Sequence, residues 1–290
     1  MQIAMTVPTM LPVGRTALRD WCREIDSGPF SSLAVPERVA WGGEACLPTL
    51  AACAAWTDRV RLVTTIIVLP SHNEVRAAKD LATADVVSDG RVTAGVGVGG
   101  RKQDYDAVGA SFTRRWQRLD EQVATMRQVW AGEYAVDGMA IGPRPVQEHL
   151  PLLAGALGPK ATARAARWAD GITGAWGIDG DMTPLAPALD AVRQAWRSAG
   201  RDAQPHLSTS LWFALGDDAE STVRTYVKDY LGVFGPEIAA MAAAAQRGFD
   251  PGILRDAVTV ADEAGCDELF LVPTSDDVGL IERVAGVLDL

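Results

Sequence analysis

The segment Gly155-Ala156-Leu157-Gly158-Pro159-Lys160 has the residue types of an anion-binding loop. It directly follows a short apolar run and begins a helical pattern that continues to Ala169. Free backbone amides at a helix start favour an anion. Pro159 suits the first turn because its missing N–H is not needed there, and Lys160 adds a positive charge. The segment therefore predicts a phosphate site, with a plain strand-to-helix turn as the alternative.

Glycines recur at the end of a predicted strand, at Gly95, Gly97, Gly99 and Gly100. The runs Val60 to Val68 and Arg91 to Val98 are β-branched and apolar, which is typical of parallel strands covered on both faces. A helical pattern separates the two runs. Missing Cβ atoms would let a flat ligand approach the backbone at these glycines. We therefore expect a cofactor to bind at this strand, helix and strand unit.

His72 is the best of the three histidines as a candidate for proton transfer, and it follows the third predicted strand. A lone loop histidine is more often structural, so that alternative stays open for His72. Neither His149 nor His206 has a visible partner in the sequence.

The composition excludes several classes of protein and site. A formal net charge of −10 and a pI near 4.8 argue against nucleic acid or an anionic membrane as a partner. The four cysteines lack metal-ligand and disulfide spacing, so we expect reduced, buried thiols and no metal site. No signal peptide or long apolar span occurs, which indicates a cytoplasmic protein. Hydrolysis has no support, because no Gly-x-Ser-x-Gly motif is present.

Short β-rich runs alternate with helical patterns along the chain, which is typical of parallel β/α architecture. The predicted strands are Gln2 to Val7, Ser32 to Val35, Val60 to Val68, Val92 to Val98, Leu152 to Gly155, Gly171 to Gly174, His206 to Ala214 and Glu268 to Val272. Most are followed by a helix, so we predict one closed, eight-stranded parallel (β/α) TIM barrel that spans residues 1–290 as a single domain. An open doubly wound sheet is the alternative, but the glycine run follows an internal strand.

Two longer connections break this repeat. Glu133 to Leu150 contains an Asp137-Gly138 turn between two short runs, which predicts a hairpin. Tyr226 to Pro251 is alanine-rich and predicted to be helical, with Gly235-Pro236 marking a helix start. We expect both insertions to lie over the carboxyl ends of the strands as lids, where such barrels keep their functional loops.

Tryptophan is abundant, with nine in the chain. Three of them follow or end predicted strands and are expected to wall a pocket: Trp41, Trp176 and Trp212. Others lie in helical patterns and are predicted to pack against the barrel: Trp116, Trp130, Trp168 and Trp196.

A set of short motifs runs through the first two thirds of the chain. They are Ala78-Lys79, Ala82-Thr83-x-Asp85, Ser88-x-Gly90-Arg91, Gly95-x-Gly97-x-Gly99, Asp104-Tyr105-x-x-x-Gly109, Arg114-Arg115, Leu119-Asp120-Glu121-Gln122 and Trp130-x-Gly132, followed by Gly155 to Gly171. In these residues the chain resembles the bacterial luciferase-like family of flavin- and deazaflavin-dependent oxidoreductases. The resemblance covers roughly the whole chain and is weaker after about Gly180.

This resemblance implies a site. Proteins similar to this one hold the cofactor phosphate at the Gly155 to Lys160 loop, with further contacts that fall here near Gly174, Ala175 and Trp176. The resemblance also implies a backbone bulge at Thr64-Thr65-Ile66, often with a non-prolyl cis peptide, against the isoalloxazine-type ring, and ring contacts at Gly97 and Gly99.

The resemblance is less complete for the acid–base groups. Related enzymes often carry an Asp-His or Glu-His pair after the second strand, where this chain has Glu37-Arg38. Glu37 could replace the carboxylate that touches the ring, and His72 follows the third strand near the expected ring position. Sugar-phosphate dehydrogenases of the family use a glutamate where this chain has Gly100, so that activity is not expected.

The resemblance implies hydride transfer between coenzyme F420 and a small organic substrate at the carboxyl end of the barrel. The first alternative is a monooxygenase that uses reduced FMN from a separate reductase. A non-catalytic flavin-binding protein and a barrel enzyme of unrelated chemistry are further alternatives. A flavin or F420 reductase would be a protein partner, and a homodimer is expected because related proteins are often dimers.

Overall fold

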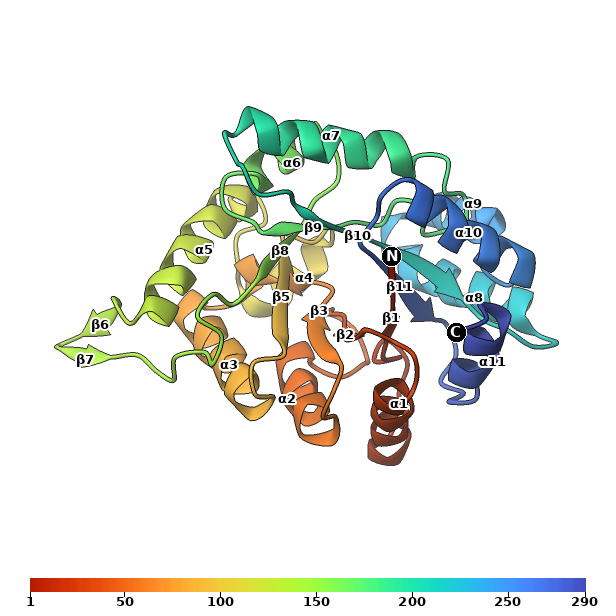
Figure 1. Cartoon of the computed structure of the whole chain (residues 1–290), viewed down its shortest axis with the longest axis horizontal. Helices are drawn as coiled ribbons and strands as arrows, with labels where there is room; N and C mark the ends of the chain where they lie inside the picture. Colours follow the sequence, from red (N-terminus) through yellow and green to blue (C-terminus); the bar gives the residue numbers. More distant parts are fainter.

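A closed barrel of parallel strands forms the centre of the computed structural model, which describes all residues from 1 to 290 (Figure 1). Its strands are β1 (Gln2–Thr6), β2 (Ser32–Val35), β3 (Arg61–Thr64), β4 (Ile67–Val68), β5 (Val92–Gly97), β8 (Leu152–Gly155), β9 (Gly171–Thr173), β10 (His206–Phe213) and β11 (Glu268–Pro273). β3 and β4 share one barrel position, so the nine strands fill eight positions. Because β3 pairs with both β2 and β5, the sheet closes on itself. The predicted barrel is confirmed.

Eleven helices surround the barrel, on its outside and over its carboxyl end. They are α1 (Arg15–Ser27), α2 (Cys46–Trp56), α3 (Glu74–Val87), α4 (Lys102–Val108), α5 (Arg115–Ala131), α6 (Pro159–Ala165), α7 (Leu185–Ser198), α8 (Ala219–Leu231), α9 (Pro236–Ala245), α10 (Pro251–Glu263) and α11 (Leu280–Val287), with 3₁₀ turns η1 (Leu69–Ser71) and η2 (Gly232–Phe234). One large apolar core of 60 buried residues includes side chains of both helices and strands. A separate small cluster comprises Ala4, Ala34, Val63, Leu153 and Phe270, one from each of five strands. This packing fixes the strand ends that carry the site. No helix is long and apolar enough to cross a membrane.

The hairpin predicted between Glu133 and Leu150 is present but lies at the other end of the barrel. Its strands are β6 (Ala135–Val136) and β7 (Met139–Ala140), joined by the predicted Asp-Gly turn. The chain order is α5, β6, β7 and β8, so the hairpin leads from a helix into the amino end of a strand. Figure 1 shows it projecting away from the barrel. The prediction that this insertion is a lid was therefore wrong.

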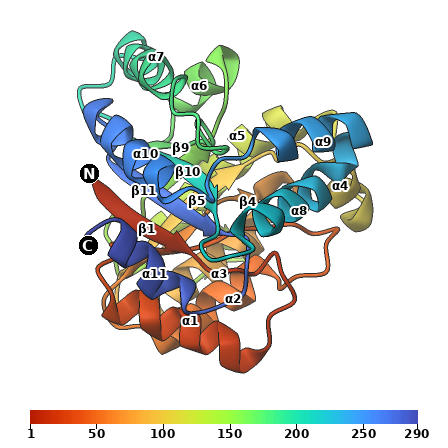
Figure 2. The same ribbon diagram turned by 90° about the vertical axis from the view of Figure 1, so that its right-hand side faces the viewer.

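The second insertion does lie on the functional-loop side. It comprises the end of α8, η2 and α9, and α9 begins at Pro236 as predicted. Figure 2 shows α4, α8 and α9 grouped beyond the carboxyl ends of the strands. A Cβ on Gly100 would lie 3.4 Å from Cζ of Phe234, so η2 rests against the loop that follows β5. The insertion thus covers the carboxyl end of the barrel.

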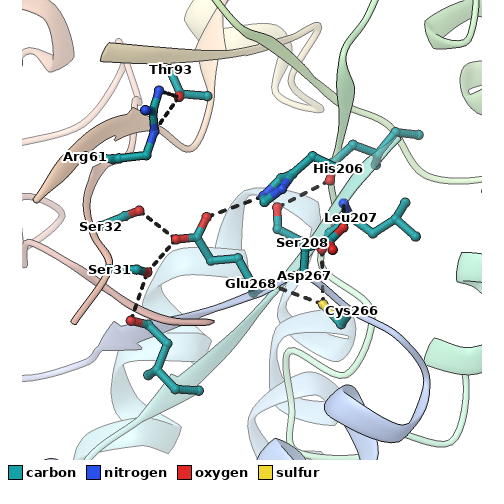
Figure 3. Close-up of polar contacts among 12 residues, drawn as sticks. Ser31, Ser32, Arg61, Thr93, His206, Leu207, Ser208, Cys266, Asp267 and Glu268 are labelled. Carbon is teal, nitrogen blue, oxygen red and sulfur yellow. Dashed lines mark hydrogen bonds and ion pairs between the residues drawn. The ribbon is translucent and has the colours of Figure 1, made fainter. Parts of the chain in front are cut away.

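A buried polar cluster closes the amino end of the barrel (Figure 3). The hydroxyls of Ser31 and Ser32 donate to Oε1 of Glu268 over 2.7 and 2.6 Å, and Nε2 of His206 lies 3.5 Å from Oε2. Burial alone would raise the pKa of Glu268, but these hydrogen bonds and the His206 charge lower it overall. His206 therefore has a partner that the sequence did not reveal, and so does His149, which meets Asp170 at 2.9 Å. The amino end of such a barrel serves stability. All four cysteines are buried and unpaired, as predicted.

Candidate active site

A cavity of about 450 Å³ opens at the carboxyl end of the barrel. The predicted cofactor residues that line it are Thr65, Ile66, Gly99, Gly155, Ala156, Leu157, Gly174 and Ala175. A second cavity of about 530 Å³ lies beside it between α6 and α7 and is lined by Gly158, Pro159 and Trp176. Thr64, Gly97, Lys160, Glu37 and His72 line neither cavity. The loops after β8 and β9 therefore separate two neighbouring spaces.

The third barrel strand is interrupted by a bulge between β3 and β4. The peptide bond between Thr65 and Ile66 is cis, as the family resemblance implied. Thr64, just before the bulge, is buried and donates its hydroxyl to the carbonyl of Gly95 over 2.8 Å. Ile66 then projects toward the neighbouring strands and lines the cavity.

The glycines of β5 make room for this bulge. A Cβ on Gly97 would lie 2.7 Å from Cδ1 of Ile66, and one on Gly95 would collide with the carbonyl oxygen of Thr64. A Cβ on Gly99 would lie 3.1 Å from Val68, although Gly99 itself lines the cavity. We expected the missing Cβ atoms to admit a ligand. For Gly95 and Gly97 that reason was wrong, because protein atoms fill the space.

Glu37 and His72 meet although they follow different strands. Nε2 of His72 lies 3.0 Å from both carboxylate oxygens of Glu37, and Oε2 of Glu37 also accepts the Val68 amide over 2.7 Å. Burial by itself would lower the pKa of His72, but the hydrogen bond and charge of Glu37 raise it overall. The backbone carbonyl of His72 is held in turn by Gln122. The pair therefore supports the end of β4 from outside the cavity, and its predicted catalytic role stays a prediction.

Arg38 occupies a buried position between two aromatic rings. Arg38 is 7% exposed, and its guanidinium lies 3.2 Å from the ring centre of Tyr230 and 4.8 Å from that of Trp41. Nη2 donates to the Tyr230 carbonyl over 2.8 Å, while Nη1 has no partner. Burial lowers the pKa of Arg38 from its usual high value. Arg38 thus ties the loop after β2 to the end of α8.

Aromatic side chains form one wall of the cavity, and two of them, Tyr226 and Tyr230, were not assigned to the site from the sequence. Tyr226 and Tyr230 stack with ring centres 5.7 Å apart, and Trp212 meets Tyr230 edge-on at 5.4 Å. Trp212 was expected to wall a pocket, and it does. Trp116 packs against the core as expected, and it also lines the cavity because it stands in the first turn of α5, at the loop end. The two tyrosines carried no signal except their position at the start of the second insertion.

The wall of the cavity is uncharged. None of the lining residues is an aspartate, glutamate, histidine, lysine or arginine. Apart from the indole N–H groups of Trp116 and Trp212, its polar side-chain groups are the hydroxyls of Thr6, Thr65, Thr173, Ser210, Tyr226 and Tyr230. The hydroxyl of Thr6 is buried and has no hydrogen-bond partner. Buried polar atoms are normally paired, so this orphaned hydroxyl fits a ligand that offers hydrogen-bonding edges without charge. A planar heterocyclic ring has this character.

The predicted phosphate loop has the expected start but a shorter helix. Gly158 has φ of 81°, and α6 begins at Pro159 as predicted. The helix ends at Ala165, since the next residues form turns, and the prediction that it continues to Ala169 was wrong. Arg164 and Arg167 are paired with Asp120, whereas Lys160 is exposed and forms no ion pair. Lys160 is therefore the free cation of this loop.

The family described as luciferase-like monooxygenase matches residues 4–285 of the chain. An uncharacterized protein of Mycobacterium tuberculosis (strain ATCC 25618 / H37Rv) is 35% identical over 168 residues, which cover 55% of this chain and 58% of that protein. An F420-dependent glucose-6-phosphate dehydrogenase of Microbacterium testaceum (strain StLB037) is 35% identical over 166 residues, which cover 51% of this chain and 48% of that enzyme. The chain thus spans about half of the length of the curated relatives that it matches.

Two solved structures share the whole fold. An F420-dependent secondary alcohol dehydrogenase in complex with an F420-acetone adduct has a TM-score of 0.77 at 18% identity, covering 99% of both chains. The monooxygenase RslO1 from Streptomyces bottropensis has a TM-score of 0.76 at 21% identity, covering 99% of this chain and 97% of that one. At these identities the likeness establishes the barrel alone.

Proposed function

Because this chain belongs to the luciferase-like monooxygenase family, we propose that it is an oxidoreductase that transfers a hydride between coenzyme F420 and a small organic substrate. The reaction would take place in the cavity at the carboxyl end of the barrel. A single observation carries the proposal. The Thr65–Ile66 bulge and the loops after β8 and β9 converge on one uncharged cavity beneath the second insertion.

The bound deazaflavin would supply the hydride chemistry, and the protein would bind, orient and shield it. The backbone at Thr65 and Ile66 would support one face of the ring, and the orphaned hydroxyl of Thr6 could serve a polar edge. Glu37 and His72 would act as positioning residues, since they hold Val68 from behind. The aromatic wall would exclude water from the other ring face.

The phosphate of the cofactor would bind at Gly158 and Lys160. This loop stands between the two cavities, so a long ligand could keep its ring in one and extend its tail along the other. The free charge of Lys160 supports this assignment. Trp176, which lines the second cavity, would lie beside the tail.

The names of several relatives support F420 over FMN. F420-dependent enzymes occur among both the sequence relatives and the fold neighbours. The monooxygenase of the same fold keeps reduced FMN as the alternative cofactor, with a separate reductase as its partner. The homodimer and the cytoplasmic location expected from the sequence stay predictions.

Fluorescence titration with F420 and with FMN, each oxidised and reduced, tests the proposal. Binding of F420 in preference to FMN is the expected result. Preference for reduced FMN would indicate the monooxygenase instead. Binding of neither cofactor would refute the proposal and leave a barrel of other chemistry. Binding without turnover of any substrate would leave a non-catalytic flavin-binding protein.

A further inference from the structure

Two tyrosines are the only groups in the cavity wall that can give up a proton. The lining residues include no carboxylate, imidazole, thiol or ammonium group. Hydride transfer to a carbonyl carbon leaves charge on the oxygen unless a proton follows, so a proton donor in the wall would complete the reaction. Tyr226 and Tyr230 are the two candidates. The Glu37–His72 pair does not line the cavity.

The surroundings of Tyr230 suit it to this task. The guanidinium of Arg38 lies 3.2 Å from its ring centre and 4.8 Å from the ring centre of Trp41. The guanidinium of Arg101 lies 5.4 Å from the same Trp41 ring. The carboxylate near these two arginines is that of Asp104, which lies 4.0 Å from Nε of Arg101. The Arg38 guanidinium is held in position, because its Nη2 donates a hydrogen bond to the Tyr230 carbonyl.

Tyr226 is less suited. It is 8% exposed and lies between Trp212 and Tyr230. Burial is the main cause that raises its pKa, and the neighbouring Tyr230 raises it further. Tyr226 would therefore keep its proton, whereas Tyr230 is only half-buried.

We propose that Tyr230 is the catalytic acid–base group and that the substrate is a small uncharged carbonyl compound or the matching alcohol. This inference rests on the proposed function. In reduction, the carbonyl carbon gains a hydride from the reduced deazaflavin, and the carbonyl oxygen gains the proton of the Tyr230 hydroxyl. The C=O π bond breaks as the C–H and O–H bonds form. The deazaflavin would be oxidised by loss of the hydride and would release one proton to solvent, and Tyr230 would regain a proton from solvent. Arg38 is the positioning residue that stabilises the transient phenolate.

The uncharged wall selects the substrate class. A phosphate or carboxylate in this cavity would have no cation among the lining residues, and an amine would have no carboxylate. Burying an unpaired charge is strongly unfavourable. A ketone or aldehyde and its alcohol are neutral on both sides of the reaction. The aromatic wall of Trp212, Tyr226 and Tyr230 further favours an apolar or aromatic substituent.

The test uses the full chain loaded with F420 and a panel of cyclohexanone, acetophenone and benzaldehyde with their alcohols, and pyruvate as the anionic comparison. Wild-type protein should turn over neutral members and discriminate against pyruvate. Tyr230→Phe should lower kcat about 100-fold or more while F420 affinity stays unchanged. Tyr134→Phe, in the segment outside the cavity, is the matched control and should retain full turnover. Arg38→Met should lower kcat more than it raises KM, and Arg38→Lys should restore part of the rate.

Binding of benzamide, an unreactive neutral carbonyl, gives a second readout by calorimetry. Its affinity should fall about fivefold in Tyr230→Phe because one hydrogen bond is lost. The inference is overturned by any of three results: turnover of Tyr230→Phe within threefold of wild type, preference for pyruvate, or no turnover of the panel by protein that binds F420. The last result would leave the proposed cofactor intact. Failure to bind F420 would instead refute the proposed function.

Discussion

Glu37 and His72 form a carboxylate–imidazole pair with both oxygens 3.0 Å from Nε2, although they follow different barrel strands. Related enzymes often carry such a pair in adjacent positions after the second strand. Here Arg38 takes the adjacent position and turns toward Tyr230, and the imidazole comes from the loop after β4. The pair thereby fixes the Val68 amide instead of facing the cavity.

The pairing predicts a pH-dependent stability. The pKa of His72 is raised above its usual 6.5, so the protonated pair stabilises the fold fully below about pH 6.5. This contribution is lost as the pH rises through the folded pKa. His72→Gln should therefore cost roughly 1 to 2 kcal/mol near pH 6 and progressively less at higher pH. Urea unfolding at a series of pH values measures this, and Glu37→Gln should abolish the same pH dependence. A constant difference between wild type and His72→Gln would contradict the assignment.

Substitution by alanine should have different effects on stability and F420 binding at the two nearby glycines Gly95 and Gly97. In Gly95→Ala the new Cβ meets the backbone carbonyl of Thr64, which cannot move aside, so a loss of roughly 3 kcal/mol or more in unfolding free energy is expected. In Gly97→Ala the obstacle is the tip of half-buried Ile66, which can rotate into the cavity. We expect only about 1 kcal/mol of destabilisation there but at least tenfold weaker F420 binding.

Gly286→Ala is the control for this pair, because its Cβ would meet nothing within 4 Å and Gly286 is an exposed position of helix α11. Thermal unfolding and F420 fluorescence measure both effects. Equal behaviour of Gly95→Ala and Gly97→Ala would rule out the packing argument.

Lys160→Gln tests the phosphate loop. Lys160 is the one cation of this loop that forms no ion pair, so its removal should weaken the binding of both F420 and FMN about fivefold and reduce the salt dependence of binding. Gly158 itself is a poor probe, since its φ of 81° would strain any other residue. Arg23→Gln, on an exposed position of α1, is the control of equal charge change. Unaltered affinity in Lys160→Gln would remove the lysine from the site.

Glu268→Gln tests the polar cluster at the amino end. The pKa of Glu268 is lowered from 4.5, so its stabilisation is present above about pH 4.5 and is lost as the pH falls through the folded pKa. At neutral pH the variant should lose about 1 to 3 kcal/mol, and its stability should fall less on acidification. Glu263→Gln, an exposed residue of α10, should stay within about 0.5 kcal/mol of wild type. F420 binding should be unchanged in both variants, because the cluster lies at the far end of the barrel.

The fold could be predicted from the sequence because apolar runs and turn glycines are local signals. Every barrel strand lies where a short β-rich run predicted it, and the Asp137-Gly138 turn correctly predicted the hairpin. The sequence did not show at which end of the barrel the hairpin lies. A connection from a helix to a strand lies at the amino end of the barrel, and the hairpin belongs to such a connection because it lies between α5 and β8.

The site was only partly readable, because its wall combines residues that are distant in the chain. The loops of Gly155 and Gly174 carried motifs, whereas Tyr226 and Tyr230 reach the cavity only through the docking of α8. The partnership of Glu37 with His72 likewise requires β2 and β4 to be brought together. Such side-chain meetings follow from tertiary packing and leave no mark in residue spacing.

Ile66 occupies the volume that side chains on β5 and β8 would otherwise fill, since a Cβ on Gly97 or Gly155 would meet it at 2.7 or 3.1 Å. The tolerance of position 97 for mutation is therefore set by position 66. Ile66→Val removes the Cδ1 atom that Gly97→Ala would meet, so the two substitutions together should be better tolerated than Gly97→Ala alone. In genetic terms these positions are epistatic, and any change to the Thr65–Ile66 bulge must be matched by a change on the neighbouring strand.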